Sequence, residues 1–366
     1  MQTDNNSAFP APPETPDFGQ ALATHTAAPQ PLQFAFTGTG SEYFRIWIVN
    51  TVLTIVTFGI YSAWAKVRTL QYFYRNTSLD GATFDYHGKP AAILKGRAIV
   101  FVLALAFQIA GKVAPMLAVL LAIALAVVFP LLLVRSLRFR MANSSYRGLR
   151  FAFTGSDAEA YKVFVLWPLL TVFTLGALAP LAHQRLKQYQ HNHTCFGTAP
   201  FAFNADVASF YGVYLRTFAM TVVVVVVAAV GGIALGVSAG SGRGAAVFAG
   251  LLGTLGIYVA LLAVGPYFNA ALQNLVWNHT TLAPHSFRSE VKASRLFYIF
   301  LTNMVGVALT LGLFLPFARV RSARYRVECM TLMARAPLDA FVAGQAENVG
   351  ALGDAAAYWY DIDIAL

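Results

Sequence analysis

The feature that most constrains this chain is a pattern that recurs along it. An apolar stretch ends in a Thr-x-Gly element, a basic amphipathic stretch follows, and a short segment of alternating aromatic residues closes the pattern. The Thr-x-Gly elements are residues 57–59, 174–176 and 310–312. Repetition on this scale indicates an architecture of duplicated units.

Composition assigns those units to a membrane protein. The chain is 57% hydrophobic and 11% charged, whereas about 25% of the residues of a soluble domain are charged. Most of its apolar stretches approach the ~20 residues that cross a bilayer as a helix. The stretches are 44–65, 91–113, 115–134, 161–182, 217–238, 245–270 and 296–318. We therefore expect an all-α polytopic membrane protein with about seven hydrophobic spans.

The recurrences divide the chain into units. A first unit covers 34–150 and a second covers 151–295, with three spans each, and a partial third covers 296–336. Residues 1–33 are rich in Pro, Ala and Thr and contain no Lys or Arg, so a disordered tail is expected there. Residues 337–366 are expected to form an acidic tail.

Short aromatic segments are expected to form β-strands at the membrane surface. Their side chains alternate with the period of two that is typical of strands. The segments are Phe34/Phe36, Phe84/Tyr86, Phe151/Phe153 and Phe201/Phe203. Because an isolated strand has unpaired backbone groups, we expect these segments to pair with one another.

The charge distribution allows two arrangements in the membrane. The net charge of +10 lies mostly beside the apolar stretches, so the basic loops 66–97 and 135–160 and the C-terminus are expected to be cytoplasmic. Seven crossings satisfy this rule but place related sequences on opposite faces. In the alternative, the Thr-x-Gly spans are broken or re-entrant, at Gly59, at Gly176 with Pro180, and at Gly312 with Pro316. Seven crossings are the favoured expectation.

The sequence also resembles a known family. The resemblance is carried by residues 34–38, 42–44, 66–68 and 76–81, and above all by the run Asn50 to Trp64. These segments are similar to those of the YjgN-type bacterial inner-membrane proteins, and the similarity covers about residues 32–335. It implies a multi-pass protein of the bacterial inner membrane and no particular reaction.

Side chains with catalytic or metal-binding potential are few. His191, His193 and Cys195 form a His-x-His-x-Cys run, which offers soft metal ligands. However, His193 and Cys195 occupy the positions of Asn76 and Ser78 in another copy of the pattern, which favours loop structure. The P-loop motif Gly-x-x-x-x-Gly-Lys-Ser/Thr and the metalloprotease motif His-Glu-x-x-His are absent from the sequence. We therefore expect no enzyme activity, no metal or other cofactor and no nucleic-acid partner.

Polar residues within the apolar stretches are the first functional candidates. Asn50, Thr54 and Thr57 share one face of a helix. Corresponding places in the other copies are held by Thr171, Thr174, Asn303 and Thr310. Such a stripe either holds helices together by hydrogen bonds or lines a path for a solute or ion, although no carboxylate lies mid-span.

Cations beside the apolar stretches are the second candidates. They suit anionic lipid headgroups, and their alternative role is to set topology. The candidate lipid contacts are Lys66, Arg68, Arg135, Arg138, Arg140, Arg319 and Arg321. The leading functional expectation is non-enzymatic transport or permeation. The alternative is an envelope scaffold or a membrane protein that interacts with lipids or with a protein partner.

Overall fold

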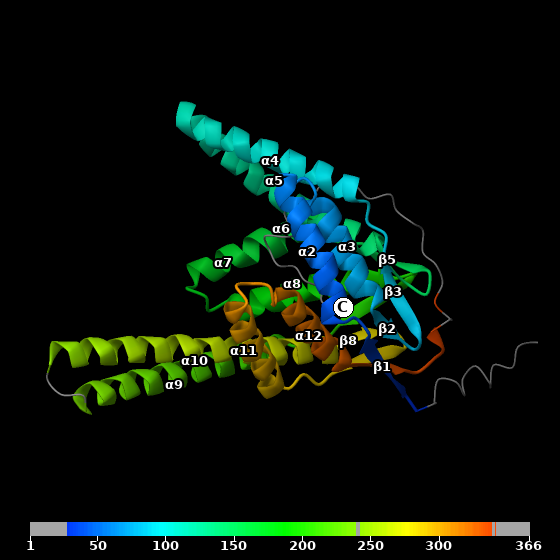
Figure 1. Ribbon diagram of the computed structural model, residues 1–366. Helices are drawn as coiled ribbons and strands as arrows, with labels where there is room; N and C mark the ends of the chain where they lie inside the picture. The colour runs from blue at the N-terminus through cyan, green and yellow to red at the C-terminus, as the bar shows by residue number, and fades with distance from the viewer. Residues whose placement is uncertain (1–27, 239–241, 339–340, 342–366) are drawn as a thin grey trace, which may run out of the picture.

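The protein combines a closed ring of short strands with helical hairpins that extend from it. The computed structural model describes residues 28–238, 242–338 and 341. Ten short antiparallel strands form the ring, and the helices leave it on one side (Figure 1). Five times in the described chain, a strand is followed by a helical hairpin and then by a second strand.

The elements have the following bounds. The first group is β1 (Gln30–Phe36), α2 (Gly40–Val56), α3 (Ser62–Arg75) and β2 (Thr77–Leu79). The second is β3 (Ala82–Tyr86), α4 (Pro90–Val113), α5 (Pro115–Ala142) and β4 (Ser144–Tyr146). The third is β5 (Leu149–Phe153), α6 (Asp157–Tyr161), the π-helix η1 (Lys162–Leu166), α7 (Trp167–Phe173), α8 (Ala179–Asn192) and β6 (Thr194–Phe196). The fourth is β7 (Ala199–Phe203), α9 (Val207–Ser238), α10 (Arg243–Asn278) and β8 (Thr280–Leu282). The fifth is β9 (His285–Ser289), α11 (Ala293–Leu309), α12 (Leu315–Glu328) and β10 (Met330–Ala334).

Each strand of the ring pairs with its neighbours along the chain, and β1 pairs with β10 to close it. Two-residue turns link successive groups. In the turns Asp80-Gly81 and Arg147-Gly148, both residues have positive φ, the conformation that matches the twist of a tight hairpin. Closure leaves the strands without a free edge.

Aromatic side chains fill the ring. Alternate residues of every strand point inward, and those of the four aromatic segments are buried. Phe84 lies 4.7 Å from Tyr146 between ring centroids, and Phe151 lies 5.0 Å from Phe196. Further contacts link Phe201 to Phe287 and Phe287 to Trp277. The interior of the ring is therefore a packed apolar core.

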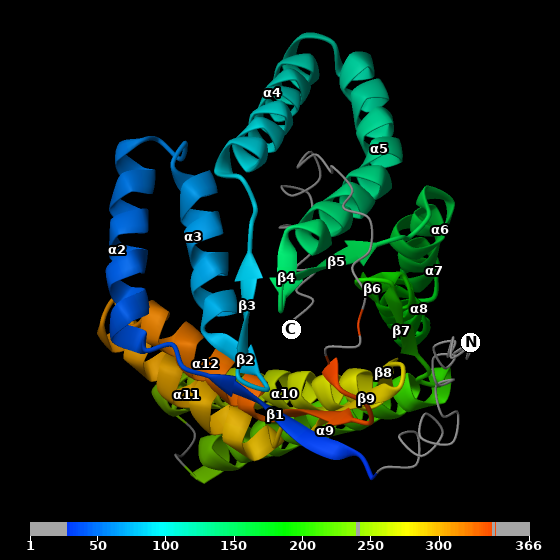
Figure 2. The ribbon, with the colours of Figure 1, turned by 90° about the vertical axis from the view of Figure 1, so that its right-hand side faces the viewer.

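The hairpins pack side by side around the ring, with the second helix of each group against the first helix of the next (Figure 2). The last hairpin packs against the first through α12 and α2. Two hairpins, α4–α5 and α9–α10, are long. The other three, α2–α3, α6–α8 and α11–α12, are short and reverse direction at the Thr-x-Gly elements.

The expected all-α fold with seven spans is wrong. Among the described residues, three helices are long and apolar enough to cross a membrane: α4, α5 and α9 as far as Ala234. The stretches 44–65, 161–182 and 296–318 each contain a chain reversal, which hydropathy does not detect because the turns are themselves apolar. The strands form a structural ring of ten, so the chain is not all-α.

The aromatic segments lie in β1, β3, β5 and β7, but they do not pair with one another as expected. Each pairs instead with strands that begin directly after a helix, as Phe84 does with Tyr146 in β4. β1 begins at Gln30, inside the segment expected as an N-terminal tail. Residues 1–27, 339–340 and 342–366 of the two expected tails lie outside the described residues.

Candidate functional site

The three short hairpins end in turns of the same construction, which we call the tips: residues 57–61, 174–178 and 310–314. A threonine ends the first helix of each hairpin, and its hydroxyl accepts a hydrogen bond from the backbone N–H four residues later. The Oγ1 of Thr57 accepts from Tyr61 at 2.9 Å, that of Thr174 from Leu178 at 3.3 Å and that of Thr310 from Phe314 at 2.8 Å.

Each tip presents one apolar side chain at its end. Phe58, Leu175 and Leu311 have φ of 49°, 50° and 51°, and 98%, 97% and 95% of their surfaces are exposed. The glycine that follows each of them also has positive φ, which glycine adopts without steric cost. A left-handed conformation at a residue with a side chain is uncommon, so its recurrence at all three tips marks a defined local structure.

The hydroxyls of the polar stripe bond within their own helices and tips. Thr54 and Thr171 donate to the carbonyls of Asn50 and Trp167, four residues earlier. Thr57, Thr174 and Thr310 do the same and also cap the tips. Among the predicted stripe residues, Thr57, Thr174 and Thr310 therefore share one structural position, at the tips of the three short hairpins.

Asn50 and Asn303 hold the two helices of a hairpin together. The Nδ2 of Asn303 donates to the carbonyl of Ala318 at 3.1 Å and to Ser322 Oγ at 3.2 Å. Asn50 makes the equivalent bond to Ala65 at 3.5 Å, and its buried Oδ1 has no hydrogen-bond partner. Both residues thus bridge α2 to α3 or α11 to α12.

Four exposed arginines occupy one level above the ring, which we call the arginine level. Each lies seven residues before the end of the second helix of its hairpin, about 10 Å from the helix end. They are Arg68 in α3, Arg135 in α5, Arg185 in α8 and Arg321 in α12. Each directly follows a buried residue, as Arg68 follows Val67, and each is itself exposed.

Within the described residues, no carboxylate pairs with these four arginines. Arg68 donates to the Tyr61 hydroxyl at 3.2 Å, Arg185 to Gln188 Oε1 at 3.0 Å and Arg321 to Asn303 Oδ1 at 3.3 Å. These neutral partners leave the positive charges available to an anion.

The structure separates the other predicted lipid contacts from this level. Arg138 donates to the carbonyl of Gly155 at 2.8 Å and contacts Asp157, so it holds the start of the next hairpin. Arg319 reaches the Tyr43 hydroxyl at 3.5 Å. Lys66 is partly buried two residues, about half a helical turn, beyond the level, and Arg140 is partly buried close to the ring.

Arg185 was not among the predicted contacts. Its position is visible in the sequence only after alignment on the C-cap residue that follows each second helix: Asn76, Asn143, His193 and Cys329. Eight residues before each of these stands one arginine of the level.

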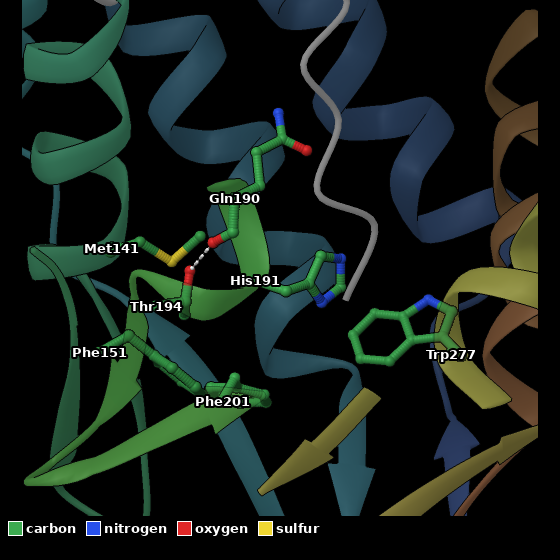
Figure 3. Close-up of a pocket in the computed structure, with 7 residues that line it drawn as sticks. All are labelled: Met141, Phe151, Gln190, His191, Thr194, Phe201 and Trp277. Carbon is green, nitrogen blue, oxygen red and sulfur yellow. Dashed lines mark hydrogen bonds between the residues drawn. The ribbon is translucent and has the colours of Figure 1, made fainter. Parts of the chain in front are cut away.

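The ring encloses a small cavity of about 20 Å³, lined by Met141, Phe151, Gln190, His191, Thr194, Phe201 and Trp277. His191 and Trp277 lie next to one another (Figure 3) in an edge-to-face arrangement, with ring centroids 5.6 Å apart. Burial lowers the pKa of His191 to about 3, and its Nδ1 lies 3.2 Å from Thr280 Oγ1. Gln190 Oε1 is buried without a hydrogen-bond partner. A cavity of this size has room for one water molecule.

His191, His193 and Cys195 do not converge. His191 points into the ring, His193 contacts Glu159 at 3.0 Å, and Cys195 lies on β6 opposite Ala152. Within the described residues, no group of three metal-ligating side chains comes together.

Comparisons with known proteins place these features in context. The family model described as "Bacterial protein of unknown function (DUF898)" matches residues 31–359. The chain is 24% identical to the inner membrane protein YjgN of Salmonella typhimurium (strain LT2) over 332 residues, which cover 78% of this chain and 84% of the relative. It is 30% identical to YjgN of Escherichia coli (strain K12) over 151 residues, which cover 40% of this chain and 37% of the relative. No solved structure matches.

Proposed function

Because this chain belongs to the DUF898 family and its relatives are named inner membrane proteins, we propose that it is an inner-membrane protein that binds anionic lipid headgroups. The binding surface is the arginine level around the strand ring. The proposed role is non-enzymatic and consists of organising lipids in the leaflet beside the ring.

The observation that carries this proposal is the common position of the four exposed arginines. They belong to four different hairpins arranged around the ring, so their charges form a belt rather than a single patch. Each cation near an anionic membrane surface contributes about 1 kcal/mol. A guanidinium also donates two parallel hydrogen bonds to a phosphate, which favours phosphate over other polar headgroup atoms.

The distribution of charge supports an orientation with the ring in the cytoplasm. Of the 26 Lys and Arg residues, only Lys112 and Arg243 lie at the far ends of the hairpins. The positive-inside rule then assigns the ring side to the cytoplasm. Since β1 and β10 are paired, the first and last strands share that side, as do the basic segments 66–75 and 135–150.

Transport or permeation, the leading expectation from the sequence, has less support. Aromatic side chains of the described residues fill the ring. The stripe hydroxyls bond to their own backbone, and Asn303 bonds across its hairpin. These contacts support a role in assembling the hairpins more than a role in lining a solute path.

Lipid retention by the purified protein tests the proposal. A variant with Arg68, Arg135, Arg185 and Arg321 changed to Gln is compared with a control in which Lys89, Arg150, Arg288 and Lys292, four exposed cations of the ring side, are changed to Gln. Both variants lose four charges. Native mass spectrometry after titration with phosphatidylglycerol is expected to show at least tenfold weaker binding for the first variant and less than threefold weakening for the control.

Equal effects in the two variants would show that binding depends on net charge alone and would contradict the proposal. Retention of phosphatidylglycerol at the wild-type level by the first variant would also contradict it. Solute-dependent flux in liposomes that survives loss of the four arginines would favour transport instead.

A further inference from the structure

We infer that the three tips lie in the hydrocarbon at the middle of the bilayer, so that the short hairpins enter and leave the membrane from the ring side. The partner of this surface is the acyl chains of the leaflet beside the ring. The inference rests on the membrane seating proposed above, but it does not depend on which headgroup the arginines bind.

Helix lengths measured from the arginine level carry the first step. In α3, α8 and α12, the helix begins six residues before its arginine, at Ser62, Ala179 and Leu315. Six residues of helix rise about 9 Å. With the turn added, each tip lies about 15 Å beyond the level along the helix axis, roughly half a hydrocarbon thickness.

The α4–α5 hairpin, the long hairpin that carries an arginine of the level, provides the comparison. In α5, 20 residues separate Pro115 from Arg135, a rise of about 30 Å that matches the full hydrocarbon thickness. The helical rise from the arginine level therefore puts the turn between α4 and α5, at Ala114, at the opposite surface. By the same measure, the three tips lie in the middle of the bilayer.

The backbone of the tips satisfies the requirement that hydrocarbon imposes. With no water to bond them, N–H groups in the membrane core need partners in the protein. At the first tip, all six N–H groups from Thr57 to Ser62 donate to a carbonyl or to the Thr57 hydroxyl. The segments 174–179 and 310–315 repeat this arrangement at every position.

The outermost side chains of the tips fit the same environment, whereas Tyr61 and Ser62 at the base of the first tip accept from Arg68 and Arg97. Phe58, Leu175 and Leu311 are at least 95% exposed, and the sequence has no charged residue within the three tips. Exposed apolar side chains on an irregular turn are unfavourable in water. In contact with acyl chains they need no protein partner.

One consequence is an asymmetric shape in the membrane. The leaflet beside the ring contains all five described hairpins, whereas the far leaflet contains only α4–α5 and α9–α10 (Figure 1). The protein therefore occupies more area in the leaflet beside the ring.

Site-directed labelling measures the depth of the tips. In a protein with Cys195 and Cys329 changed to Ser, single cysteines are introduced as Phe58→Cys, Leu175→Cys and Leu311→Cys, which replace exposed side chains and leave the packing intact. Thr198→Cys, in the turn between β6 and β7, and Ala114→Cys serve as controls for the two surfaces. Each variant is reconstituted in phosphatidylethanolamine–phosphatidylglycerol vesicles.

A membrane-impermeant maleimide is expected to label Thr198→Cys from the ring side, Ala114→Cys from the other side and the tips from neither. A fluorophore attached to each tip before reconstitution is expected to be quenched most by lipids brominated at the ends of their acyl chains. Labelling of the tips from either aqueous side, or strongest quenching by headgroup quenchers, would overturn the inference.

The lipid-binding test of the arginines and the labelling test of tip depth can give independent results. If the tips lie at the midplane while the arginine variant still binds phosphatidylglycerol, the headgroup proposal is wrong and the depth assignment stands. If the tips are labelled from water while the arginine variant loses lipid, the opposite holds.

Discussion

At the residue scale, the capping threonines differ from the other threonines of the stripe. Thr57 donates to Leu53 and accepts from the Tyr61 N–H, whereas Thr54 only donates to Asn50. Thr57→Val leaves the Tyr61 N–H without a partner, which costs about 1–3 kcal/mol. Thr54→Val should cost about 0.6 kcal/mol. Unfolding titrations in detergent micelles compare the two, and Thr57→Ser, which keeps the hydroxyl, should retain wild-type stability. Equal losses of stability for the two Val variants would mean that the bond between the Tyr61 N–H and the Thr57 hydroxyl adds no stability of its own.

The buried His191 gives a pH dependence at the same scale. Its pKa is lowered to about 3 by burial, against about 6.5 in an unfolded chain. The unfolded state therefore binds more protons between these values, and the contribution of the neutral imidazole is complete above pH 6.5 and is lost as the pH falls toward 3. Between pH 7 and pH 4.5 the wild type should lose about 2–3 kcal/mol more stability than His191→Phe. Thermal unfolding at both pH values measures this difference, and parallel losses would contradict it.

At the element scale, hydrogen bonds between helices set the stability of each short hairpin. Asn303 donates to two groups of α12, while Asn50 makes one long bond to α3 and keeps an unpartnered Oδ1. We therefore expect Asn303→Leu to cost about 1–3 kcal/mol and Asn50→Leu to cost less. Unfolding titrations test the order, and a larger loss for Asn50→Leu would show that the geometry of the two hairpins differs in the membrane.

The tips offer a second test at this scale. Asn is enriched at positive φ, so in water Phe58→Asn should leave stability unchanged or raise it. In hydrocarbon the amide is left without partners, which costs about 1–3 kcal/mol. We expect Phe58→Asn to lower the free energy of unfolding by this amount in lipid bicelles. Arg147→Asn, at a partly buried residue that also has positive φ in a turn on the ring, is the control for the backbone preference. Arg147→Lys is measured beside it to show how much of any change comes from the altered bond to Asp80.

The elements also show what sequence reasoning reaches. The chain reversals at Gly59, Gly176 and Gly312 were foreseen as possible breaks, because glycine and proline mark turns in apolar stretches. The choice between a break and a continuous span depended on tip hydrogen bonds that no residue pattern reveals. The strands β2, β4, β6 and β8 have three residues each, too few for a period of two to be recognised. The common level of the arginines is defined by their distance from the helix ends, so it can be recognised only once those ends are known.

At the scale of the whole molecule, the ring closes through strands at the two ends of the described chain. β1 pairs with β10 from Gln30↔Ala334 to Gln33↔Thr331, across about 300 residues, so no local signal in the sequence predicts the contact. In the proposed inner-membrane setting, closure also constrains the topology, because paired first and last strands then lie on one side of the membrane. An odd number of crossings between them is therefore impossible.

A designed disulfide tests this closure. In the background without native cysteines, Gln33→Cys with Thr331→Cys should form a cross-link within one chain under mild oxidation, because paired residues of adjacent strands have Cβ atoms about 4.5–5.5 Å apart. Gln33→Cys with Thr281→Cys is the matched control, since Thr281 pairs with Ala202 and lies on β8. Faster migration of the first variant on non-reducing gels, reversed by dithiothreitol, is the expected result. Cross-links only between chains, or equal cross-linking in the control, would mean that the ring is open in the membrane. The pairing of β1 with β10 would then no longer support the orientation proposed above.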